Sequence, residues 1–161
     1  MGKGCILRRK DREIKEIIDL KDIVSKADVC RIAFAVNNTP YIVTMNFGYT
    51  WNTDLILYFH CAKEGRKLDL IRQNNRVCFE MDIDHELELG ETPCKGTMKY
   101  KSIIGYGSLE IVGDQKEKKE GFDLIMDKYG YAGKKEYDEK FFNMTEILRL
   151  KVTEIAGKRK A

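Results

Sequence analysis

The sequence predicts a mainly β fold, a small closed or partly closed β-barrel with helices between and outside its strands. Six segments carry the period-two alternation, or the short apolar run, that is typical of strands. The 161 residues are long enough for one domain with a real core, and no repeat or linker divides them. The six expected strands are residues 29–36, 41–49, 55–60, 76–84, 100–112 and 145–155.

The first three expected strands follow an amphipathic helix. Apolar residues at helical spacing predict that helix over residues 13–27. Short polar turns join the three strands that come next, which favours an antiparallel meander. In the strand at 41–49 the apolar face alternates with a second face, on which Thr44 and Asn46 are the polar side chains.

Residues 58–84 predict a strand, a tight basic turn, a short helix and another strand. Gly65 interrupts the apolar pattern, and Arg66 and Lys67 stand where the helix begins. A helix N-terminus offers unpaired backbone N–H groups and the positive end of a dipole, so two cations at this place make a phosphate site. The alternative interpretation is a surface turn with solvated charges.

The next segments are expected to form a loop and a long strand. Residues 85–99 have no periodicity and predict a long loop. Gly105 and Gly107 interrupt the strand at 100–112. Glycines inside a strand mark a bulge, a bend, or a close approach by another backbone or a ligand.

A helix and a closing strand are expected to complete the chain. Asp114 is placed to cap the helix, and Gly130 is placed to end it. Residues 131–144 are aromatic-rich and are expected to be irregular. The strand at 145–155 should leave a frayed basic tail.

Composition argues against several classes of protein. The net charge of +3, with acidic residues scattered among the basic ones, is too small to indicate a nucleic-acid partner. No apolar run approaches the roughly 18 residues of a membrane span, and no signal-peptide core is present, so we expect a cytoplasmic protein. The five cysteines lack C-x-x-C spacing, which favours reduced thiols. The acidic segment around His85 lacks the spacing of a metal site, so no metal is expected.

Four fragments, in this order, resemble the flavin-binding split-barrel family that includes pyridoxamine 5′-phosphate oxidase. Within that family the chain looks closest to the nitroimidazole-resistance branch. The resemblance covers about residues 8–155 of a single domain, 1–161. The fragments are DVCRIAF at 28–34, PYIVTMNFGY at 40–49, YFH at 58–60 with GRK at 65–67, and MKYKSIIGYG at 98–107.

The resemblance implies a homodimeric, six-stranded antiparallel split barrel with two flavin sites at the subunit interface. The flavin would be FMN, or FAD if the adenosine can extend into solvent. Arg66 and Lys67 match the family's Ser-Arg-Lys phosphate grip, in which Gly65 replaces the serine and removes one hydroxyl donor. One subunit would line the isoalloxazine ring with Val43, Thr44, Met45 and Asn46, and the other would reach it with Lys99, Tyr100, Ser102 and Ile104.

By the same resemblance, His60 at the end of the third strand lies near the flavin. The chain has neither paired catalytic carboxylates nor a nucleophile elbow, so it is poorly equipped for hydrolysis, whereas a flavin would carry the redox chemistry itself. We predict an oxidoreductase that reduces a small electron-poor molecule, with a nicotinamide or another donor supplying electrons. His60 would donate a proton to the reduced product as a general acid, or orient the substrate over the ring. Cys61 would point to the opposite face of the strand from His60.

Two other functions stay open. The first is a non-catalytic flavin-binding or ligand-sequestering protein on the same barrel. The second is a single-stranded nucleic-acid barrel, against which stands the lack of exposed aromatic stripes and of net basicity. Oxidation of vitamin B6 is not expected, because the C-terminal segment has no counterpart of the oxidase's Arg-x-His-like feature.

Overall fold

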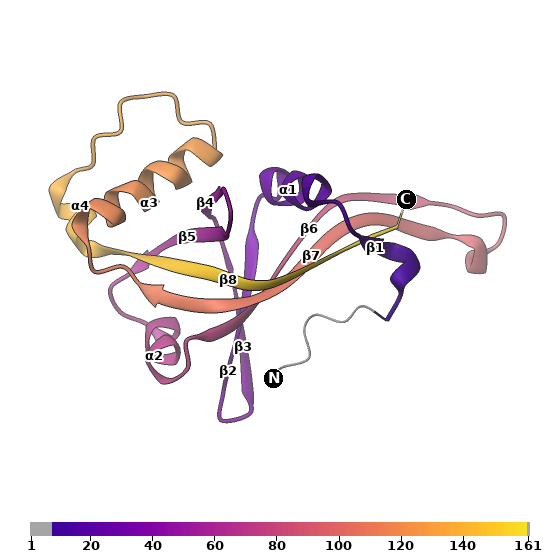
Figure 1. The fold of residues 1–161 in the computed structure, drawn as a ribbon, viewed down its shortest axis with the longest axis horizontal. Coiled ribbons are helices and arrows are strands. Elements are labelled where there is room, and N and C mark those ends of the chain that lie inside the picture. The colour runs from indigo at the N-terminus through magenta and orange to yellow at the C-terminus, as the bar shows by residue number, and fades with distance from the viewer. Residues whose placement is uncertain (1–7, 161) are drawn as a thin grey trace.

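In a computed structural model, which describes residues 8–160, eight strands form one antiparallel sheet (Figure 1). Neighbouring strands follow the order β3-β2-β6-β7-β8-β5-β4, and β1 pairs with β8. The mainly β, antiparallel fold that the sequence predicts is therefore confirmed. The strands are β1 (Glu13–Ile14), β2 (Cys30–Val36), β3 (Thr39–Met45), β4 (Gly48–Trp51), β5 (Leu55–Ala62), β6 (Arg76–Glu88), β7 (Thr97–Ile111) and β8 (Thr145–Lys160).

Four α-helices accompany the sheet within the described residues. The third is capped as expected, because the Asp114 carboxylate accepts a hydrogen bond of 2.8 Å from the backbone N–H of Glu117. The fourth was expected to be irregular chain, and it forms because Asp138 caps it through the N–H groups of Lys140 and Phe141. The helices are α1 (Ile17–Lys26), α2 (Arg66–Gln73), α3 (Gln115–Lys128) and α4 (Glu139–Met144), with single 3-10 turns at Lys10–Arg12 and Pro93–Lys95.

The strand count and the expected meander are corrected by the pairing. Residues 41–49, expected as one strand, divide at Asn46 and Phe47 into β3 and β4. β3 pairs with β2, whereas β4 pairs with β5, so the first three expected strands do not form a meander. The expected first helix also starts late, at Ile17, because Glu13 and Ile14 pair with β8 as the short strand β1.

Residues 85–99 are not the long loop expected. β6 continues to Glu88 and β7 begins at Thr97, so the two strands form a hairpin arm that projects from the barrel (Figure 1). The arm has no hydrophobic period because its side chains are largely exposed on both faces. Cross-strand ion pairs support it instead, as between Lys99 and Glu88 at 2.7 Å. The expected frayed tail is likewise strand, since β7 and β1 both pair with the end of β8.

The core lies between the curled halves of the sheet and contains the alternate residues of each strand. Its largest fully buried side chains include Phe34, Phe47, Phe59 and Phe79, one from each of four segments. Gly105 is required beside this core, because a Cβ atom there would stand 2.5 Å from both the Phe79 ring and the Glu154 carbonyl oxygen. The predicted close approach at this glycine is therefore confirmed. A register shift between Tyr106 and Gly107 confirms the bulge.

Candidate functional site

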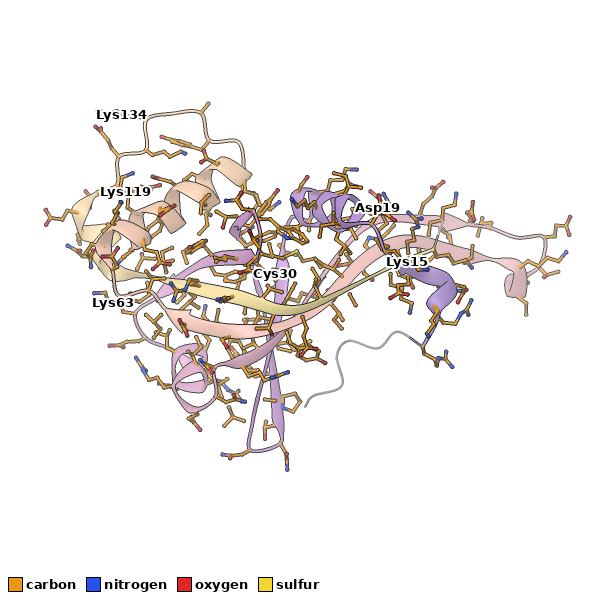
Figure 2. All side chains as sticks on the ribbon, in the orientation of Figure 1. Lys15, Asp19, Cys30, Lys63, Lys119 and Lys134 are labelled. Carbon is orange, nitrogen blue, oxygen red and sulfur yellow. The ribbon has the colours of Figure 1, made fainter. Side chains whose placement is uncertain are left out.

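The N-terminus of α2 joins two strands that lie towards opposite ends of the sheet order. The Arg66 guanidinium lies 4.5 Å from the centroid of the Tyr41 ring on β3. Lys67, the next residue, lies close enough to His60 on β5 to act on its imidazole. The first turn of α2, which follows the turn marked by Lys63 in Figure 2, is therefore in reach of side chains from both β3 and β5.

Gly65 precedes this turn with a φ of +132°, a backbone conformation that side chains disfavour. A Cβ atom there would meet nothing within 4 Å, so the conformation rather than crowding requires glycine. No side chain caps α2 at Gly65.

The two cations of this turn are not neutralised by the protein. Within residues 8–160, neither Arg66 nor Lys67 forms an ion pair with a carboxylate. Asp69, in the same turn of α2, pairs with Arg72 at 3.1 Å instead. Two uncompensated cations at the positive end of a helix dipole provide the donor set that an anion such as a phosphate requires.

His60 is the histidine nearest this cationic turn. It faces outward on β5, where it is opposite Ile147 of β8, and the neighbouring Cys61 is buried on the other face as predicted. Part of its side chain reaches solvent, yet partial burial, together with the charge of Lys67, lowers the pKa of His60. At neutral pH the imidazole is therefore mostly uncharged and can accept or relay a proton.

The predicted ring-lining residues of β3 divide between two faces. Met45 is buried and Val43 half-buried on the inner face, whereas Thr44 is exposed on the outer face. Asn46 follows the end of β3, and its side-chain amide donates to the Asp28 carbonyl oxygen at 3.4 Å. Thr44 and Asn46 are thus available to a ligand outside the barrel, and Val43 and Met45 can offer it only their backbone.

Thr44 begins a row of side chains that crosses the outer face of the sheet. Directly paired residues of antiparallel strands place their side chains on one face. The register joins Thr44 to Arg31, Arg31 to Glu80, Glu80 to Ile104 and Ile104 to Ala156. Ser102 lies one row further along β7, opposite Asp82. The structure therefore places Ile104 and Ser102 on the same face as Thr44, three strands away.

Sequence reasoning missed the charge cluster at the centre of this face. Arg31 donates to Glu80 at 2.9 Å and also to Asp82. His85 lies 2.8 Å from Asp82 through its Nε2 atom. Burial raises the pKa of Glu80, against the opposing effect of its bond to Arg31. The alternating polar residues of 76–84 could have indicated the carboxylates of this cluster. Only the pairing of β2 with β6 shows that Arg31 is the cation that meets them.

Lys99 and Tyr100 lie on the hairpin arm, away from the α2 turn. They border a hollow of about 420 Å³ together with Asp84, His85 and Lys160. Lys99 pairs with Glu86, ten residues along β6 from Arg76, the residue that begins β6 after α2, a separation of about 33 Å at 3.3 Å per residue. A single chain therefore does not bring them to Arg66 and Lys67.

Two classes of feature are not found in the described part of the chain. No group of three or more His, Cys, Asp or Glu side chains is arranged to hold a metal ion. No helix is long and apolar enough to cross a membrane.

Cys30, Cys61, Cys78 and Cys94 are free thiols, and Cys5 lies outside the described residues.

Comparison with known proteins identifies relatives of this chain in sequence and in fold. The sequence model of the family described as pyridoxamine 5′-phosphate oxidase matches residues 18–159. A Bacteroides thetaiotaomicron protein, provisionally described as a 5-nitroimidazole antibiotic resistance protein, is 28% identical with a TM-score of 0.79, covering 91% of this chain and 86% of its own. The FAD binding protein from Mycobacterium smegmatis is 26% identical with a TM-score of 0.59, covering 91% and 96%.

A third solved structure shares the fold alone. The flavocytochrome from Azotobacter vinelandii is 16% identical with a TM-score of 0.82, covering 97% of this chain and 72% of its own. A search of curated proteins finds no match.

Proposed function

The chain belongs to the pyridoxamine 5′-phosphate oxidase family, and on that basis we propose that it binds a flavin, FMN or FAD, between two copies of itself and uses it to reduce a small electron-poor molecule. A nitroaromatic or nitroimidazole-like compound is the proposed substrate class, because the 28% identical Bacteroides protein carries a nitroimidazole-resistance description. A nicotinamide or another reductant would supply the electrons.

The observation that carries this proposal is the pair of uncompensated cations at the start of α2, next to His60. Arg66 and Lys67 would hold the flavin phosphate together with the first N–H groups of the helix. Among the described residues, no atom lies within 4 Å of where a Cβ atom of Gly65 would stand, which leaves open space on that side of the turn. The grip therefore fits the group that the family implies.

The flavin, when bound, supplies the electron transfer, and the protein supplies binding, orientation and protons. His60 lies within electrostatic reach of Lys67, so it would hold or deliver a proton at the reduced product. Thr44 and Asn46 would offer polar contacts to the ring edge, and the backbone of Val43 and Met45 would line it.

A second copy of the chain would complete the site. Lys99 and Tyr100 lie on the hairpin arm, too far from the α2 turn to act on the same flavin within one chain, and Ser102 and Ile104 follow them along β7. In the proposed homodimer these residues come from the partner and form the wall over the ring.

A second candidate function is flavin binding without catalysis. It is favoured by the sparse acid–base equipment near the grip, where His60 stands without a carboxylate partner among residues 8–160. The 26% identical Mycobacterium smegmatis protein is likewise described only as an FAD binding protein.

Anaerobic reduction of the purified, flavin-loaded protein tests the two functions against each other. The absorption spectrum first shows whether flavin is bound, and a reduced nicotinamide or dithionite then reduces it. Reoxidation by a panel of nitroaromatic compounds, faster than by free flavin at the same concentration, supports the oxidoreductase. Bound flavin that no acceptor reoxidises faster than free flavin supports the binding protein.

A further inference from the structure

The backbone pairing of β2 with β3 ends at Cys30 and Met45, next to the residues proposed to line the flavin ring. Its register runs from Val36 opposite Thr39 to Cys30 opposite Met45. Continued by two residues, the same register would set Asp28 opposite Phe47. The hydroxyl of Tyr129 stands between those two backbones instead: it accepts from the Phe47 N–H at 3.2 Å and donates to the Asp28 carbonyl at 2.6 Å.

We call this arrangement the Tyr129 bridge. A direct ladder bond would bring the N and O atoms to about 2.9 Å, whereas the bridge links them through two successive hydrogen bonds. The backbones at Asp28 and Phe47 are therefore held apart while their polar groups stay satisfied. β3 can leave the ladder after Met45 and turn into β4, and Asn46 stands at this corner.

The bridge also fixes the side chain of Asn46. The Asp28 carbonyl that accepts from Tyr129 accepts from the Asn46 amide as well, at 3.4 Å. A carbonyl oxygen has two lone pairs, so it can serve both donors. The position of Tyr129 and the direction of Asn46 are thus linked through one atom.

α3 holds the bridge in place from two sides. A Cβ atom on Gly48 would stand 2.4 Å from the backbone of Leu124 and Ile125, so the helix backbone lies directly against the start of β4. The ammonium of Lys128 donates to the Ser25 and Val24 carbonyls at 2.9 and 3.2 Å. It also lies 4.6 Å from the centroid of the Phe47 ring. Because Tyr129 directly follows Lys128, these contacts keep its backbone close to Asp28 and Phe47.

We infer that Tyr129 is a positioning residue for the flavin site: its bridge opens the end of the β2–β3 ladder and thereby sets the corner from which Asn46 meets the ring. This inference rests on the proposed function, because it assigns a role to Tyr129 in the flavin site. It assigns no contact between Tyr129 and the flavin. The alternative is that the hydroxyl stabilises the fold without affecting the ligand.

Replacement of Tyr129 by Phe removes the bridging hydroxyl and keeps the ring. The matched control is Tyr131→Phe, because Tyr131 is a nearby exposed tyrosine whose hydroxyl reaches only the Lys134 carbonyl, at 3.5 Å. Three properties are measured for both variants. Amide hydrogen exchange at Phe47 is followed in the flavin-free protein, and the FMN dissociation constant and the visible spectrum of the bound flavin are recorded at saturation.

We expect Tyr129→Phe to accelerate exchange at Phe47 and to weaken FMN binding, each by about tenfold, and to shift the spectrum of the bound flavin. The control should match the parent in all three. A variant that only loses stability would melt earlier but would give the parental spectrum once saturated, and that result overturns the positioning role. Unchanged exchange at Phe47 overturns the bridge itself.

Failure of the proposed function gives a different result. A parent protein that binds no flavin overturns the proposed function and the role of Tyr129 in it together. A parent that binds FMN, with a Tyr129→Phe variant that binds it equally well, overturns the inference alone.

Discussion

Lys67 in α2 and His60 on β5 face the same small region, although six residues and a turn separate them in the chain. Partial burial and the charge of Lys67 both lower the pKa of His60. The proposed phosphate grip and the proposed proton donor are therefore electrostatically coupled, because the cation that attracts the phosphate also disfavours a charged imidazole.

Replacement of Lys67 by Gln is expected to raise the pKa of His60 in the flavin-free protein, since one of the two causes of its depression is removed. A proton NMR titration of the imidazole measures this directly. Lys63→Gln is the matched control, because Lys63 is an exposed lysine in the turn between β5 and α2. Equal His60 titration in the two variants would contradict the coupling.

Removal of the imidazole in His60→Ala is expected to leave FMN binding within about threefold of the parent. It should lower the turnover of a nitroaromatic acceptor by about 100-fold, the typical contribution of a general acid. Because the pKa of His60 lies below its ordinary value of about 6.5, the protonated fraction falls as pH rises through a midpoint below that value. Parental turnover should therefore decline from acidic to neutral pH, and the variant should lose this dependence.

The control for this prediction is Cys61→Ala, which alters the adjacent residue on the buried face of β5. It removes a buried side chain and so costs some stability, but it should keep the parental pH profile. A His60→Ala variant that reduces the acceptors as fast as the parent would remove His60 from the mechanism.

A homodimer is expected in solution, because Lys99 and Tyr100, which would help to cover the ring, lie on the arm too far from the α2 turn in one chain. Ile104→Glu places a charge on the outer sheet face beside Glu80 and should shift sedimentation towards the monomer and weaken FMN binding with it. Ile18→Glu, on the exposed side of α1, is the control and should remain a dimer. A parent that sediments as a monomer and still binds one flavin per chain would refute the shared site.

Gly48→Ala is expected to destabilise the protein by about 1–3 kcal/mol, or more if α3 cannot shift, because the new methyl group would overlap the backbone of Leu124 and Ile125. Urea denaturation measures the loss. Gly113→Ala is the matched control, since its Cβ atom would meet nothing within 4 Å. Equal stability of the two variants would mean that α3 does not pack directly on β4.

Much of the fold could be predicted from local pattern. The alternation at 29–36 and 76–84 predicted two strands whose inner faces are buried, and Asp114 predicted the start of α3. What failed depends on contacts distant in sequence. Where 41–49 divides, the hydroxyl of Tyr129, directly after α3, bridges Asp28 and Phe47, and no sequence feature near Asn46 predicts this contact. The hairpin arm was not predicted as strand because both of its faces are largely exposed, so its sequence has no hydrophobic alternation.

Those parts of the candidate site that lie within one short segment of the chain could be predicted from the sequence. The turn at Gly65 could be recognised from the sequence alone, because a glycine is followed there by two cations at the start of a helix. In the structure these cations have no carboxylate partners among the described residues. The link between Lys67 and His60 also follows from their closeness in sequence. The link between Arg31 and the carboxylates of β6 does not, because it depends on the register of two strands about 50 residues apart, a register that side-chain pattern alone does not give.

The most direct test of the account is the affinity of the flavin-free protein for FMN, measured by fluorescence quenching in the parent, in Arg66→Ala/Lys67→Ala and in the control Arg72→Ala on the same helix. Each charge-assisted hydrogen bond to the phosphate contributes about 1.5–3 kcal/mol, and about 1.4 kcal/mol is tenfold in affinity. We predict binding by the parent and the control, and at least about 100-fold weaker binding by the double variant. Equal affinity in all three proteins would contradict the phosphate grip, and a parent that quenches no FMN fluorescence would contradict the flavin site altogether.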